Sequence, residues 1–116
     1  MTPGDVARIT ERRDEVAFVD LLRAAGPEFE DAAFEPALAD ALRSNPPLIE
    51  RWNMWSGDQR WTPTAVVDGV TTVWVPGGGG RSEHLRVHSD GAAAVADFIH
   101  RMAAWLGRRE VLVVEE

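Results

Sequence analysis

Residues 64–75 read TAVVDGVTTVWV and decide the fold class, because here the apolar pattern changes from helical spacing to β-type runs. Two runs rich in Val, Thr and Trp, 64–67 and 70–75, lie on either side of Asp68 and Gly69. Asp followed by Gly favours a two-residue type I′ turn, in which both central residues take a positive φ. The stretch therefore predicts an antiparallel hairpin with Asp68 and Gly69 at its turn.

The residues that follow predict a third strand. Four consecutive glycines at 77–80 are typical of a loop, and the segment 84–88 then alternates between polar and apolar residues. Because side chains alternate across a strand, the polar and apolar members lie on opposite faces, with His84, Arg86 and His88 on one and Leu85 and Val87 on the other. The three strands together form a meander.

A long amphipathic helix and a final strand are predicted next. Residues 92–106 have apolar side chains at helical spacing after Ser89 or Asp90, either of which can cap the helix. The polar side of this helix is expected to carry Asp97, His100 and Arg101. The continuous apolar run 111–114 predicts a strand buried on both faces.

Three helices are predicted before the hairpin: over 14–25, over 36–43, and between Asn45 as the N-cap and Gly57 as the stop. Their boundaries come from Pro in first turns and Gly at ends. Residues 5–13 fit either an extra helical turn or a short extended arm. The chain thus predicts one α+β domain over 1–116, of order ααα-βββ-α-β, with an antiparallel meander and helices packed on one face.

Composition excludes several classes of function. The 116 residues carry net charge −7, from 19 Asp and Glu against 12 basic residues, which disfavours nucleic acid and anionic membranes as partners. The absence of Cys excludes disulfides, thiolate nucleophiles and Cys-ligated metals. No segment approaches the roughly 18 apolar residues of a membrane span. We therefore expect a cytoplasmic protein, and twelve arginines without a lysine indicate a GC-rich, bacterial genome.

One candidate site is the polar face of the third strand. Two imidazoles and a guanidinium on one face can hold an anion and exchange protons near neutral pH. A small enzyme or ligand-binding domain would use His84, Arg86 and His88 beneath Trp61 or Trp74, with a carboxylate from Asp58. The simpler interpretation is a solvated polar strand face. No metal or cofactor is predicted, since no third metal ligand is fixed by the spacing.

The other candidate site is acidic. Residues 1–45 carry ten acids and five arginines, and the segment 26–42 contains no basic residue. Its acids are Glu28, Glu30, Asp31, Glu35 and Asp40. A negative surface can steer a basic protein into contact. The polar loop that follows the third helix, with Asp58, Arg60 and Trp61, is expected to add an aromatic contact.

The preferred hypothesis is a non-catalytic, acidic protein-binding module with a basic protein partner. An immunity, antitoxin-like or regulatory role fits by analogy with size and charge. The chain has no HExxH, EF-hand or nucleophile-elbow spacing. A third hypothesis is a homodimer formed through an unpaired strand at 111–114.

Overall fold

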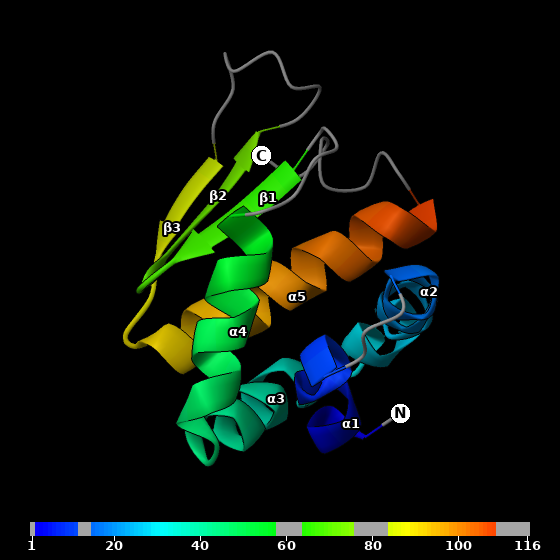
Figure 1. Ribbon diagram of the computed structural model, residues 1–116, viewed down its shortest axis with the longest axis horizontal. Coiled ribbons are helices and arrows are strands. Elements are labelled where there is room, and N and C mark those ends of the chain that lie inside the picture. Colours follow the sequence, from blue (N-terminus) through cyan, green and yellow to red (C-terminus); the bar gives the residue numbers. More distant parts are fainter. Residues whose placement is uncertain (1, 12–14, 58–63, 76–83, 109–116) are drawn as a thin grey trace.

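The computed structural model describes residues 2–11, 15–57, 64–75 and 84–108 (Figure 1). The predicted hairpin is present: β1 (Thr64–Asp68) pairs antiparallel with β2 (Thr71–Val75). The predicted turn is wrong by one residue, since Asp68 pairs with Thr71 and leaves Gly69 and Val70 as the loop. Gly69 takes φ 64, the positive value that the first central position of a primed hairpin turn requires.

The meander is also confirmed. β3 (His84–Val87) pairs antiparallel with β2, and the sheet order is β1-β2-β3, so β1 and β3 are the edges. Val67 and Thr72, which lie opposite each other, are buried under the helices. The predicted strand at 111–114 and the glycine loop at 77–80 lie outside the described residues.

The helix predicted at 92–106 is α5 (Gly91–Arg108), and it lies at the centre of the molecule. Asp90 caps it, because its Oδ1 accepts a hydrogen bond from the Ala93 backbone N–H at 2.9 Å. The predicted apolar stripe is buried, with Val95, Phe98, Ile99 and Met102 at 0% exposure. The sheet, α2, α3 and α4 all contact this helix, so it is covered on several sides.

The side of α5 opposite the apolar stripe is also covered. Asp97 and Arg101, predicted on that polar side, are only 1% and 4% exposed. Both are covered because the side of α5 away from the helical layer meets the sheet. His100 is only half-buried.

The helices predicted before the hairpin are α2 (Glu15–Ala24), α3 (Phe34–Arg43) and α4 (Pro46–Gly57). A 3-10 helix, η2 (Gly26–Glu30), joins α2 to α3. No helix of the described residues has the length and apolarity to cross a bilayer.

The first residues, left open by the sequence, form short helices rather than an extended arm. α1 (Pro3–Ala7) begins at a capping box in which Thr2 and Asp5 bond each other's backbone N–H groups at 3.1 Å. A 3-10 turn, η1 (Ile9–Glu11), follows. These short helices bury Val6 and Ile9 in the core.

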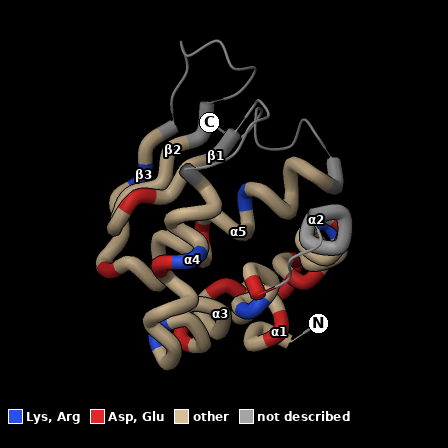
Figure 2. Tube along the Cα trace, in the orientation of Figure 1, with Lys and Arg blue, Asp and Glu red and all other residues tan. Residues whose placement is uncertain are grey.

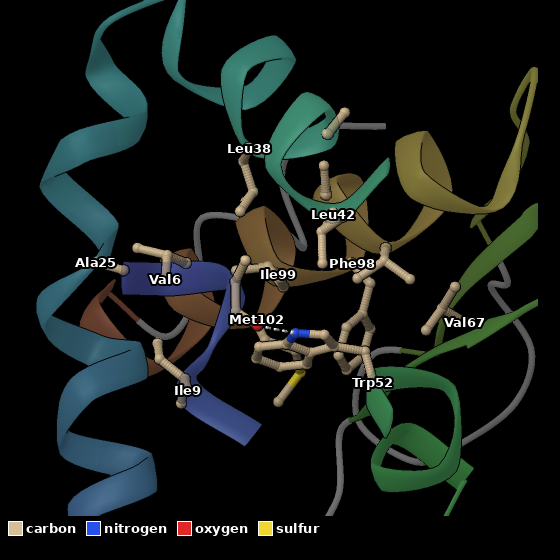
Figure 3. Packing of buried hydrophobic residues seen from close by; sticks show 14 of the residues in the cluster. Val6, Ile9, Ala25, Leu38, Leu42, Trp52, Val67, Phe98, Ile99 and Met102 are labelled. Atoms are coloured by element: carbon tan, nitrogen blue, oxygen red, sulfur yellow. Dashed lines mark hydrogen bonds between the residues drawn. The ribbon is translucent and has the colours of Figure 1, made fainter. Parts of the chain in front are cut away.

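Trp52 of α4 connects the core to this N-terminal segment (Figure 3). Its ring is fully buried, and Nε1 donates to the Ala7 carbonyl at 3.0 Å. Trp55 and Phe98 meet the same ring edge to face, with centroids 6.2 and 6.1 Å away. Leu48 and Trp52 are both buried, so one face of α4 belongs to the core.

Candidate functional site

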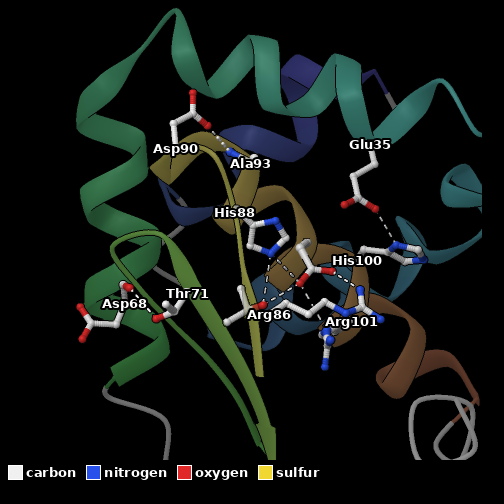
Figure 4. A network of polar contacts seen from close by, with 11 residues as sticks. Glu35, Asp68, Thr71, Arg86, His88, Asp90, Ala93, His100 and Arg101 are labelled. Carbon is white, nitrogen blue, oxygen red and sulfur yellow. Dashed lines mark hydrogen bonds and ion pairs between the residues drawn. The ribbon is translucent and has the colours of Figure 1, made fainter. Parts of the chain in front are cut away.

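A buried carboxylate organises the polar residues between the sheet and α5. Asp97 Oδ2 accepts from Thr72 Oγ1 at 2.7 Å and lies 3.1 Å from His88 Nε2. Asp97 Oδ1 accepts from Arg86 Nη1 at 2.9 Å. Arg101 Nε lies 3.4 Å from Oδ2, one helical turn along α5. Arg86 of β3, His88 just after it and Arg101 of α5 therefore converge on one carboxylate (Figure 4). We call these five residues the Asp97 cluster.

The register of the sheet explains why these residues meet. Val67, Thr72 and Arg86 are in register across the three strands, so their side chains lie on the same face. Thr72 is fully buried on that face, which places Arg86 on the side of α5 as well. His88 follows Arg86 at a spacing of two and points the same way.

The charges around Asp97 outweigh the cost of its burial. Burial acts to raise the pKa of this carboxyl, but the Thr72 hydrogen bond and the charges of Arg101, Arg86 and His88 together hold that pKa below its ordinary value. Asp97 is therefore ionised near neutral pH. A carboxylate that bonds His88 Nε2 orients the imidazole and leaves Nδ1 to accept a proton or a ligand hydrogen bond, if Nε2 carries the proton.

The structure supplies a different carboxylate from the one predicted for this face. Asp97 of α5 meets Arg86 and His88, whereas the predicted carboxylate Asp58 lies outside the described residues. The same holds for Trp61, and the side chains of His84 and Trp74 are not described. The described residues contain no group of three His, Asp or Glu that could hold a metal ion.

Asp97 and Thr72 were missed by the sequence reasoning, although a signal was available. The helix 91–108 contains six alanines, and two of them, Ala92 and Ala94, lie on different sides of the helix and are both buried. Small apolar residues on more than one side are typical of a helix packed from several directions. In such a helix an Asp and an Arg at a spacing of four are candidates for a buried ion pair.

The two faces of β3 differ from a simple polar-out, apolar-in pattern. The apolar residues Leu85 and Val87 are 62% and 70% exposed, whereas on the face toward α5 Arg86 is half-exposed and His88 is 19% exposed. Across the sheet, Val66 and Val73 lie in register with Leu85 and are partly exposed. These four residues form an apolar outer face, which no described helix covers.

β3 also has an open backbone edge. The His88 N–H donates to the Val70 carbonyl at 2.8 Å, so His88 and, by alternation, Arg86 direct their backbone groups toward β2. The N–H and C=O groups of Leu85 and Val87 therefore point away from β2. No described residue bonds them. We call this open side, with its exposed side chains, the β3 edge.

The opposite edge of the sheet is covered by α4. Ser56 Oγ accepts from the Val67 N–H at 3.1 Å and donates to the Val67 carbonyl at 3.0 Å. Asn53 Oδ1 accepts from the Gly69 N–H at 2.9 Å. Side chains of a helix thus replace a neighbouring strand along β1, and the two edges of the sheet differ.

The predicted acidic site is only partly an open negative surface. The acids of η2 and α3 lie in the helical layer, where acidic and basic residues adjoin (Figure 2). Asp40 pairs with Arg43 at 2.6 Å, and Glu35 lies 2.7 Å from His100 Nδ1. Asp31 caps the turn at Ala33, bonding its N–H at 3.0 Å. Glu30 and Asp31 are exposed. The loop residues Asp58, Arg60 and Trp61 lie outside the described residues.

The chain matches no protein-family model, no curated protein and no solved structure. The described residues hold one distinctive local arrangement: an open apolar strand edge is held against a central helix by a buried carboxylate. Both parts meet at β3, with Arg86 on one side of the strand and Leu85 and Val87 on the other.

Proposed function

We propose that this protein is a non-catalytic protein-binding module and that the β3 edge is its binding surface. The observation that carries the proposal is the exposure of Leu85 and Val87, 62% and 70%, on a strand with outward-pointing backbone groups. Folded proteins normally protect such edges with charges, proline, bulges or a covering helix, because an open apolar edge recruits another chain. This chain protects β1 by α4, so the open β3 edge is consistent with a partner.

The Asp97 cluster supports this role by holding β3 rigid. Asp97 connects the strand to α5 through Arg86 and His88, and to β2 through Thr72. A strand held in its binding conformation loses less conformational entropy when a partner binds. We therefore assign the cluster a positioning role behind the binding surface.

The sequence-based hypothesis of a basic partner remains part of the proposal, through a second surface. Glu30 is the last residue of η2 and Asp31 follows it, and both are exposed. Their negative charges would speed association with a basic protein. We also propose that the module acts in the bacterial cytoplasm, in an immunity, antitoxin-like or regulatory role. Twelve arginines without a lysine support the bacterial origin.

A second candidate function is a small-ligand site at Arg86 and His88. The orientation of His88 by a buried Asp97 favours it, because the same pairing prepares an imidazole for proton transfer. Arg86 is half-exposed and can hold an anion. Shifts of the His88 ring resonances on addition of phosphate or acetate, without any effect of peptides, would favour this candidate over protein binding.

The protein-binding proposal is tested by capture from a lysate of the source organism with four forms of the tagged full chain. The forms are the wild type, Leu85→Thr with Val87→Thr, Glu30→Gln with Asp31→Asn, and Met54→Thr. Met54 is an apolar residue of α4 that is 74% exposed and lies outside both proposed surfaces, so it is the matched control. We expect the Leu85/Val87 variant to lose a protein that the wild type and the Met54 variant both retain. Equal capture by all four forms would rule out the β3 edge. Loss by the Glu30/Asp31 variant alone, at low salt, would favour the acidic surface instead.

A further inference from the structure

We infer that the β3 edge takes an extended peptide whose residues alternate between apolar and acidic, added to the sheet as a fourth strand. This inference rests on the proposed function and specifies its partner. Strand addition draws its affinity from backbone hydrogen bonds and its selectivity from alternate side chains. The β3 edge offers both kinds of contact.

The backbone contacts come from the outward groups of Leu85 and Val87. Each residue presents one N–H and one C=O away from β2, at the spacing of alternate residues in an antiparallel or parallel ladder. An added strand would therefore continue the meander without any change in the existing β2–β3 pairing.

The side chains of the added strand would meet two different surfaces. On the outer face they would contact the exposed Leu85 and Val87, and beyond them Val73, which favours apolar residues. On the face toward α5 they would meet Arg86, whose side chain is 51% exposed. Strict alternation of side chains then requires apolar and polar residues in turn.

The polar residues of the partner are acidic because Arg86 has donors left to give. Its bond to Asp97 uses Nη1, whereas a guanidinium carries five N–H groups. Asp97, the acidic member of the Asp97 cluster, is 1% exposed and lies behind Arg86 and His88. A carboxylate on the added strand can pair with Arg86, whereas a lysine there would face like charge.

The same charges disfavour a second copy of this chain as the occupant. In the longest two-fold antiparallel pairing of β3 with itself, Leu85 lies opposite Val87 of the copy and Arg86 lies opposite Arg86. Like charges directly opposite one another destabilise a strand pair. The geometry thus favours a strand with acidic residues, supplied by the partner, over a second copy of β3.

The test is amide hydrogen exchange by NMR on the full chain, with two capped seven-residue peptides that alternate Val with Glu or Val with Lys. With the Glu peptide at ten times its Kd, we expect exchange at Leu85 and Val87 to slow about tenfold. The Ala33 amide, which bonds Asp31 in the turn before α3, is the internal control and should not change. The Lys peptide should give no slowing.

Each other outcome overturns the inference in a recognisable way. Equal slowing by both peptides refutes the acidic preference but leaves protein binding intact, and slowing by neither refutes strand addition. Slow amide exchange at Leu85 and Val87 in the free protein would mean that the β3 edge is already occupied. If the protection of these amides increases with protein concentration, the occupant is a second copy of the chain. If it does not, the occupant is another segment of the same molecule. Failure of the proposed function would be seen in a different experiment, the lysate capture. There, the variant with Leu85→Thr and Val87→Thr would retain the same proteins as the wild type.

Variants at Val87 and Arg86 sharpen the test. Val87→Pro removes the outward N–H without removing a bond to β2, and should weaken binding of the Glu peptide about tenfold. Val87→Ile keeps the N–H and should bind as the wild type does. Arg86→Gln should lose the preference for Glu over Lys, and Arg86→Lys should retain it. Equal affinity of the Pro and Ile variants would refute the backbone contact.

Discussion

Replacing Asp97 by Ala should destabilise the protein far more than replacing an exposed aspartate. Asp97 is 1% exposed, and its removal takes away the partner of Thr72, which is fully buried, and of Arg101, which is 4% exposed. Removing one member of a buried ion pair costs about 3 to 5 kcal/mol. The bond to Arg86 adds little, because that side chain is half-exposed and screened by water. We therefore expect a loss of about 3 kcal/mol, a large part of a typical stability of about 5 to 15 kcal/mol.

The matched control is Asp40→Ala. Asp40 also pairs with an arginine, Arg43, at 2.6 Å, but its side chain is 77% exposed. Exposed ion pairs contribute about 0 to 1 kcal/mol, so this variant should unfold almost like the wild type. The assay is urea unfolding followed by tryptophan fluorescence, with the free energy of unfolding compared at an unchanged m-value.

Equal destabilisation by the two substitutions would refute the reasoning. It would mean that the buried carboxylate of Asp97 contributes no more to the free energy of unfolding than the exposed carboxylate of Asp40. Burial would then not strengthen the contacts of Asp97. A greater stability of the Asp97 variant would mean that the cost of burying the charge exceeds the gain from Thr72, Arg86 and Arg101. In either case the positioning role assigned to the Asp97 cluster would fall.

Three further predictions concern pH, the covered edge and the hairpin turn. The pKa of Asp97 is lowered in the folded state, so the ionised carboxylate stabilises the fold fully above the pKa of the unfolded carboxyl. This stabilisation is lost as pH falls through the folded pKa. The difference in unfolding free energy between the wild type and Asp97→Ala should therefore shrink below about pH 4, as measured by urea titrations at several pH values. Ser56→Ala leaves the buried Val67 N–H and C=O without their bonds and should cost about 1 to 3 kcal/mol in the same assay, whereas an unchanged stability would show that α4 does not protect the β1 edge. Gly69→Ala meets no atom within 4 Å, so the expected loss of about 1 to 2 kcal/mol comes from φ 64 alone, and thermal unfolding showing no loss would contradict the turn geometry.

The elements that the sequence predicted well are those with local causes. Apolar spacing placed α4 and α5, and turn chemistry placed the hairpin, because these signals depend on neighbouring residues. The error of one residue at the turn has a physical source. Both Asp68-Gly69 and Gly69-Val70 allow a glycine with positive φ, and the pairing of Asp68 with Thr71 decides between them.

The sequence by itself determined that His84, Arg86 and His88 share one face of a strand and that Leu85 and Val87 share the other, because alternation is a property of the extended backbone. Which face is buried was decided by the tertiary structure. Asp97 of α5 offers Arg86 and His88 a buried carboxylate, and that ion-pair network turns the polar face inward and leaves the apolar face in solvent. Hydrophobic pattern alone predicts the opposite, since it carries no information about a charge that approaches from another element.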